Sequence, residues 1–155
     1  MSRRQKKEVL FNYDEIREVI INSSESSAIY VGADSQRFRK GGVTYVAYVT
    51  AIILHIDSEH GGKLFKQLKI QRDYGQTRLR LMNEVYMASE AATEILDCVG
   101  ARTFEIHLDI NPDNKFKSNS VVKEATGYVL GMFGFTPKIK PESFAASTVS
   151  DRYTK

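Results

Sequence analysis

The feature that most constrains the fold is a change of hydrophobic period near residue 77. Before this point, three β-rich runs at residues 28–33, 43–56 and 64–70 are separated by glycine-containing connections, which predicts an antiparallel meander. Residues 77–99 instead have apolar side chains at helical spacing. That predicted helical face consists of Leu81, Met82, Val85, Ala88, Ala92, Ile95, Leu96 and Val99.

The segments on either side of these elements are shorter. They are a helix capped by Asn12 or Asp14, a strand at 103–108, a helix from 118–120 to 131–134, a strand at 135–139 and a brief helix within 142–155. This order predicts an α/β fold. Its mixed five-stranded sheet has three antiparallel strands, then two helix-linked parallel strands, with helices on its faces. Ribonuclease H-like folds have the same order of elements.

Length and composition indicate one domain over residues 1–155, with residues 1–7 expected to form a mobile basic arm. The single cysteine, Cys98, excludes an internal disulfide and a zinc site built on cysteines, and it is expected to be a small buried residue. We predict a cytoplasmic protein, because the sequence contains neither a membrane-length apolar run nor a signal peptide. The glycine pairs lack phosphate-loop spacing, so no P-loop nucleotide is expected.

The net charge of +3 is too small to identify a partner, but the basic residues are clustered. Arg37, Arg78 and Lys140 are candidates for phosphate contacts, and Tyr74 and Phe116 are candidates for base stacking. A solvated surface is the alternative for each of them.

Four carboxylates are candidates for a shared site. Asp34 and Asp109 follow apolar strands, which would bring both to the centre of the sheet if those strands are parallel neighbours. Glu84 falls at the edge of the apolar helical face, and Asp151 lies in a segment that can fold back. Convergent carboxylates would bind Mg²⁺ or Mn²⁺, and two such ions catalyse phosphodiester hydrolysis.

Each carboxylate also has a structural alternative. Asp34 and Asp109 suit turns or caps, Glu84 taken alone is predicted to be a solvated residue at the helix edge, and Asp151 suits a cap or the surface. His107 is a candidate for proton transfer but is better interpreted as a hydrogen-bonded core residue. Asp113 is a further candidate ligand, with a turn role favoured.

Five segments carry a resemblance to a known family. GADSQ at 32–36, RLMNE at 80–84, HLDIN at 107–111, KIKPESFAAS at 138–147 and DRYTK at 151–155 resemble the YkuK family of ribonuclease H-like proteins. The resemblance implies a ribonuclease H-like fold and, through the wider superfamily, a divalent-metal nuclease site. Its ligands would be Asp34, Glu84, Asp109 and Asp151.

Two functions follow as hypotheses. The first is a nuclease that uses Mg²⁺ or Mn²⁺, expected as two ions, to hydrolyse phosphodiester bonds of RNA, DNA or a hybrid. The second is an inactive ribonuclease H-like module that binds nucleic acid or serves as a protein adaptor.

Overall fold

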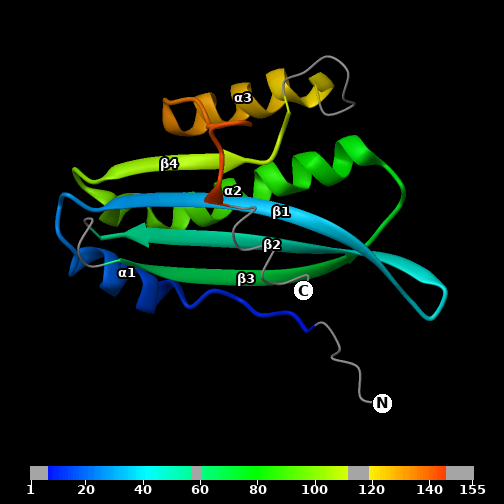
Figure 1. The fold of residues 1–155 in the computed structure, drawn as a ribbon, viewed down its shortest axis with the longest axis horizontal. Coiled ribbons are helices and arrows are strands. Elements are labelled where there is room, and N and C mark those ends of the chain that lie inside the picture. Colours follow the sequence, from blue (N-terminus) through cyan, green and yellow to red (C-terminus); the bar gives the residue numbers. More distant parts are fainter. Residues whose placement is uncertain (1–6, 57–60, 112–118, 146–155) are drawn as a thin grey trace.

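One mixed sheet dominates the computed structural model, which describes residues 7–56, 61–111 and 119–145 (Figure 1). Within these residues the strand order is β3-β2-β1-β4, with β1 parallel to β4 and antiparallel to β2, and β2 antiparallel to β3. The strands are β1 (Ala28–Lys40), β2 (Val43–His55), β3 (Gly62–Arg72) and β4 (Thr103–Leu108). The helices are α1 (Tyr13–Ile21), α2 (Thr77–Val99) and α3 (Asn119–Phe133).

The β1–β2 hairpin is much longer than its predicted first strand. Backbone pairing runs from Ala28 opposite His55 to Lys40 opposite Val43. Gly41 and Gly42 have φ values of 58° and 77°, the left-handed conformations that a tight two-residue hairpin turn requires. Figure 1 shows the hairpin tip projecting beyond the rest of the sheet. The prediction ended the strand early because its second half is mostly polar, although it pairs with β2 throughout.

The predicted fifth strand at 135–139 is wrong, because the described sheet has four strands. This segment makes an isolated parallel bridge between Lys138 and His107. The Lys138 amide donates to the Ile106 carbonyl, and the Lys138 carbonyl accepts from the Leu108 amide, each at 2.8 Å. The Lys140 amide also donates to the Ile110 carbonyl at 3.1 Å, but β4 ends at Leu108, so the contact stays a single bridge.

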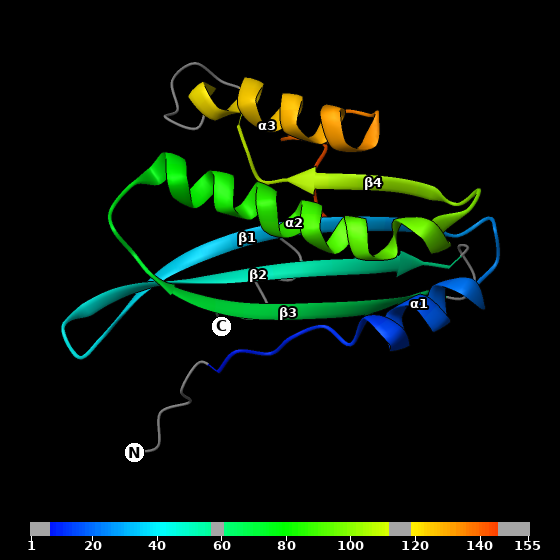
Figure 2. The ribbon, with the colours of Figure 1, turned by 180° about the vertical axis from the view of Figure 1, so that it is seen from behind.

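The core lies between the sheet and the helices. Figure 2 shows α1 and α2 on the same face of the sheet and α3 alongside β4. Alternate β1 residues Ile29, Val31 and Ala33 are fully buried in the cluster that includes Val85 and Ile95 of α2. The predicted bounds of α2 are confirmed, with Gly100 at its C-cap. Among the described helices, none combines the length and the apolarity needed to cross a membrane.

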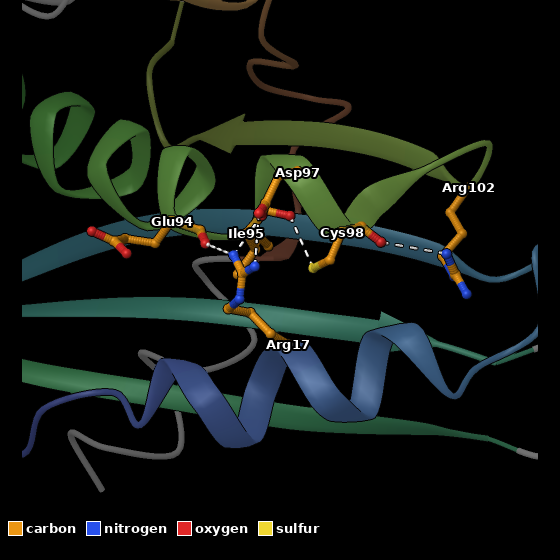
Figure 3. Close-up of polar contacts among 6 residues, drawn as sticks. All are labelled: Arg17, Glu94, Ile95, Asp97, Cys98 and Arg102. Carbon is orange, nitrogen blue, oxygen red and sulfur yellow. Dashed lines mark hydrogen bonds and ion pairs between the residues drawn. The ribbon is translucent and has the colours of Figure 1, made fainter.

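Two arginines connect α1 to α2 and to the corner before β4 (Figure 3). Arg17 of α1 pairs with the Asp97 carboxylate and donates to the Glu94 carbonyl at 2.8 Å. Arg102 donates to the Ser23 carbonyl at 2.6 Å and hydroxyl at 3.0 Å, and to the carbonyl of Val99 at 3.2 Å. Arg102 thus joins the loop after α1 to the end of α2.

We expect Arg102→Ala to lower the free energy of unfolding by about 2 kcal/mol. The substitution removes charged hydrogen bonds and leaves the carbonyl groups that accepted them without a donor. Urea unfolding followed by circular dichroism would measure the loss as a lower midpoint at unchanged slope. Arg39→Ala is the matched control, since Arg39 makes one exposed hydrogen bond, to the Gly42 carbonyl. Equal midpoints for the two variants would contradict this account of the corner.

Candidate active site

The end of β4 defines the position of the two aspartates. Ala33 opposite Leu108 is the last pair between the parallel strands β1 and β4. Asp34 is therefore the first β1 residue beyond β4, and Asp109 follows β4 directly. Figure 1 shows β4 stopping partway along β1. Asp34 remains within β1, opposite Val49 of β2, and Asp109 follows the neighbouring parallel strand, so the two aspartates lie at the same level of the sheet.

Glu84 of α2 is buried, with 3% of its surface exposed. The Ser35 hydroxyl donates to its Oε2 at 2.5 Å and accepts from Nη1 of Arg80 at 2.8 Å. The interpretation of Glu84 as a solvated residue is therefore wrong. A helical projection locates a residue relative to the apolar face of its own helix, but it does not include the polar partners supplied by β1.

The electrostatics of Glu84 connect the three described carboxylates. Burial is the main cause that raises the pKa of Glu84 well above its ordinary value. Repulsion from Asp34 and from Asp109 raises this pKa further, whereas the Ser35 hydrogen bond and the Arg80 charge oppose the shift. The three acids are thus close enough for the charge on either aspartate to affect the protonation of Glu84.

Lys140 supplies a cation to the same group. Its Nζ lies 2.9 Å from Oδ1 of Asp109, and the two side chains are 49% and 23% exposed. The hydrogen bond to Asp109 is the main cause that raises the pKa of Lys140, and the charges on Asp109, Asp34 and Glu84 raise it further. Lys140 therefore lies in the negative field of all three carboxylates.

The carboxylates approach from different sides of β1. Successive strand residues point to opposite faces, so Asp34 points away from the α2 face to which Ser35 points. No set of three His, Cys, Asp or Glu side chains in the described stretches is arranged to hold a metal ion. The three carboxylates nevertheless lie near enough for Asp34 and Asp109 to raise the pKa of Glu84 beyond the effect of burial.

The remaining candidates are dispersed. Arg37 pairs with Asp73 at 2.9 Å, and Arg78 of α2 pairs with Glu124 of α3. Among the three candidate carboxylates that the structure describes, the contact with a basic candidate is that of Asp109 with Lys140. The candidates outside the described residues are Asp151, Asp113 and Phe116.

Sequence reasoning missed the roles of Ser35 and Arg80. Their positions in the sequence, next to the candidate carboxylates, could have indicated these roles. Arg80 lies one helical turn before Glu84, and Ser35 follows Asp34.

His107 is a buried core residue, as its structural interpretation predicted. Its Nδ1 accepts from the Phe144 amide at 3.1 Å, and its Nε2 lies 2.9 Å from the Glu105 carboxylate. Because Nδ1 is an acceptor, Nε2 carries the proton and donates to Glu105. The ring also packs on Tyr30 and Phe144, with centroids 5.2 and 4.5 Å away. His107 thus anchors residues 144–145 to the sheet.

Comparison with known proteins identifies the family of the chain. The family model described as "Ribonuclease H-like" matches residues 12–155. The "Uncharacterized protein YkuK" of Bacillus subtilis (strain 168) is 30% identical over 145 residues, covering 84% of this chain and 80% of that protein. No solved structure gives a significant match.

We expect Glu84→Gln to leave the free energy of unfolding at pH 7 unchanged or higher. The native pKa of Glu84 lies above its unfolded value near 4.5, so between these two values the native state binds more protons than the unfolded state. Stability contributed by Glu84 is therefore lost as pH rises through this interval. Glutamine removes the buried charge and keeps an acceptor for Ser35.

Urea midpoints of wild type and Glu84→Gln, measured at several values between pH 4.5 and 7.5, would test this sign. The advantage of the variant should grow with pH. Glu90→Gln is the matched control, because the Glu90 side chain is on the same helix and 63% exposed. A variant that becomes less stable relative to wild type as pH rises would contradict the electrostatic account.

Proposed function

Because the chain belongs to the ribonuclease H-like family, we propose that it is a divalent-metal-dependent nuclease acting on phosphodiester bonds of nucleic acid. The observation that carries this proposal is the buried carboxylate of Glu84, which accepts a hydrogen bond from Ser35, the residue after Asp34. Burial raises the pKa of Glu84, and the charges on Asp34 and Asp109 raise it further. Clustered like charges of this kind lower folding stability, and they are typical of functional sites.

The chemistry of the donor set suits Mg²⁺ or Mn²⁺. Asp34, Glu84 and Asp109 offer oxygen atoms alone, which are the ligands these hard cations prefer. The Lys140 ammonium lies against Asp109. It therefore occupies a position next to this carboxylate that a metal ion could take. We propose Asp34, Glu84, Asp109 and Asp151 as the ligands of two ions. Asp151 rests on the family resemblance, since it lies outside the described residues.

Bound divalent ions would activate a water molecule and stabilise the leaving oxygen. In the hydrolysis, the water oxygen forms a bond to phosphorus, the bond from phosphorus to the 3′ oxygen breaks, and that oxygen takes up a proton. The products carry 3′-hydroxyl and 5′-phosphate ends. Lys140 is placed to contact the phosphate when an ion takes its position beside Asp109. Arg37 and Arg78 are proposed to contact the backbone further along the substrate.

A catalytically inactive nucleic-acid-binding or adaptor module is the second candidate. The observation that favours it is the pairing of Asp109 with Lys140, together with the lack of a three-ligand group among the described side chains. Such a module would bind its partner without a divalent ion. Metal dependence therefore separates the two candidates.

We expect Asp34→Asn to reduce Mn²⁺-dependent cleavage of RNA, DNA and hybrid substrates by at least 100-fold, on the order of a lost charged ligand or stabilising group. The folded protein should remain, because the substitution changes charge but little volume. Mn²⁺ should raise the melting temperature of wild type more than that of the variant, since ion binding stabilises the native state. Cleavage is read on labelled oligonucleotides, and melting is read by circular dichroism.

Asp14→Asn is the matched control, because Asp14 is an aspartate of the first turn of α1, outside the site. It should keep wild-type cleavage and the wild-type response to Mn²⁺. Full activity of Asp34→Asn would disprove the nuclease assignment. A wild-type protein that binds nucleic acid but neither cleaves it nor responds to Mn²⁺ would establish the module instead.

A further inference from the structure

A pocket of about 370 Å³ lies beside the proposed active site, where the end of β3 leads into α2. Its wall includes Arg72 and Tyr74 from the connection, Tyr48 from β2, and Arg80 and Asn83 from α2. The volume falls near the lower end of the range of about 300–1,000 Å³ for small-molecule sites. It therefore suits one small ligand group.

The uncharged part of the wall suits a nucleobase. Tyr74 is 72% exposed and offers its ring to solvent, with the Arg72 guanidinium carbon 5.8 Å from the ring centroid. Exposed aromatic rings of this kind stack on unpaired bases. The amides of Gln71, Gln76 and Asn83 add donors and acceptors that can pair with base edges.

The charged part of the wall suits a phosphate. Asp73 is the acidic residue of the wall, and its carboxylate lies 2.9 Å from Nε of Arg37 and is 8% exposed. Its charge is therefore compensated from outside the pocket. Arg72 and Arg80 are the two arginines that line the pocket. The Nε of Arg80 is buried and has no hydrogen-bond partner among the described residues.

Arg80 joins the pocket to the carboxylates. It lines the pocket and donates to the Ser35 hydroxyl at 2.8 Å, and this hydroxyl donates to Glu84. A ligand against Arg80 is therefore two hydrogen bonds away from the buried acid. The pocket is placed to hold the group next to the phosphodiester that the carboxylate site would act on.

We propose that this pocket binds one unpaired nucleotide, so that the substrate is a single-stranded nucleic acid or a single-stranded end. The base stacks on Tyr74, and the attached phosphate is bound by Arg80. A base within a duplex is paired and stacked between its neighbours, and it cannot enter a pocket of this size without being extruded. The inference rests on the proposed function for its substrate class, but nucleotide binding does not require catalysis.

Fluorescence anisotropy in EDTA tests binding without cleavage. The probes are labelled single-stranded RNA and DNA oligonucleotides and the blunt duplexes formed from them. Wild type should bind single strands more tightly than duplexes. Tyr74→Ala should weaken single-strand binding about fivefold or more, because it removes a base–aromatic stack. Tyr74→Phe should keep wild-type affinity, because the ring remains.

Two controls separate the pocket from general effects. Tyr86→Ala removes another exposed tyrosine, one that packs on Tyr128 with a centroid distance of 5.2 Å, and it should leave binding unchanged. Asp14→Asn, which removes an aspartate of the first turn of α1 outside both sites, should bind single strands as wild type does. Melting curves establish that each variant is folded. Arg72→Ala serves as a second pocket variant, with weaker single-strand binding expected.

The proposal is overturned if Tyr74→Ala and Arg72→Ala bind single strands within twofold of wild type, if both weaken duplex binding equally, or if wild type binds no single strand. The nuclease proposal fails separately. A wild type that cleaves nothing with Mn²⁺, yet binds single strands through Tyr74, retains the pocket and loses the activity. If Tyr74→Ala cleaves as wild type does, and single strands and duplexes are cleaved equally, the nuclease proposal stands and the pocket proposal fails.

Discussion

Burial of the Glu84 carboxylate against β1 is the interaction on which the proposed site depends. A buried carboxylate is unfavourable unless hydrogen bonds or opposite charges compensate it. Ser35 and Arg80 supply both, from a neighbouring strand and from the preceding helical turn. This compensation is incomplete, because the pKa of Glu84 remains raised. The core that holds α2 on the sheet therefore stabilises an arrangement that the acidic groups alone would oppose.

The short length of β4 determines which groups come together. β4 ends opposite Ala33, so pairing between β1 and β4 stops one residue before Asp34. Near this strand end the charge on Asp34 raises the pKa of Glu84, and Lys140 lies in the field of both carboxylates. The end of β4 thus positions Asp109 beside Asp34, and Asp109 in turn contacts Lys140.

Sequence reasoning succeeded where hydrophobic periodicity determines the structure and failed where polar pairing does. The bounds of α2 and β4 follow from their apolar residues and are confirmed. The second half of β1 was missed because its polar side chains conceal a fully paired backbone. A fifth strand was predicted at 135–139, although this segment meets β4 at a single bridge. The alternative of a solvated Glu84 was wrong because its partners, Ser35 and Arg80, become neighbours through tertiary structure. The assignment of Asp34, Glu84, Asp109 and Asp151 as metal ligands stays a prediction.

Arg80 gives the two proposed binding events a physical connection. In the unliganded protein its guanidinium lowers the pKa of Glu84 and bonds to Ser35. A phosphate bound at Arg80 would compensate part of that positive charge, which leaves the three carboxylates more negative in effect and strengthens their attraction for a divalent ion. By thermodynamic reciprocity, an ion bound to the carboxylates would favour phosphate binding in the pocket by the same factor. The wall of the pocket and the acidic cluster would then act as one site, in which a cation and a single-stranded substrate each increase the affinity for the other.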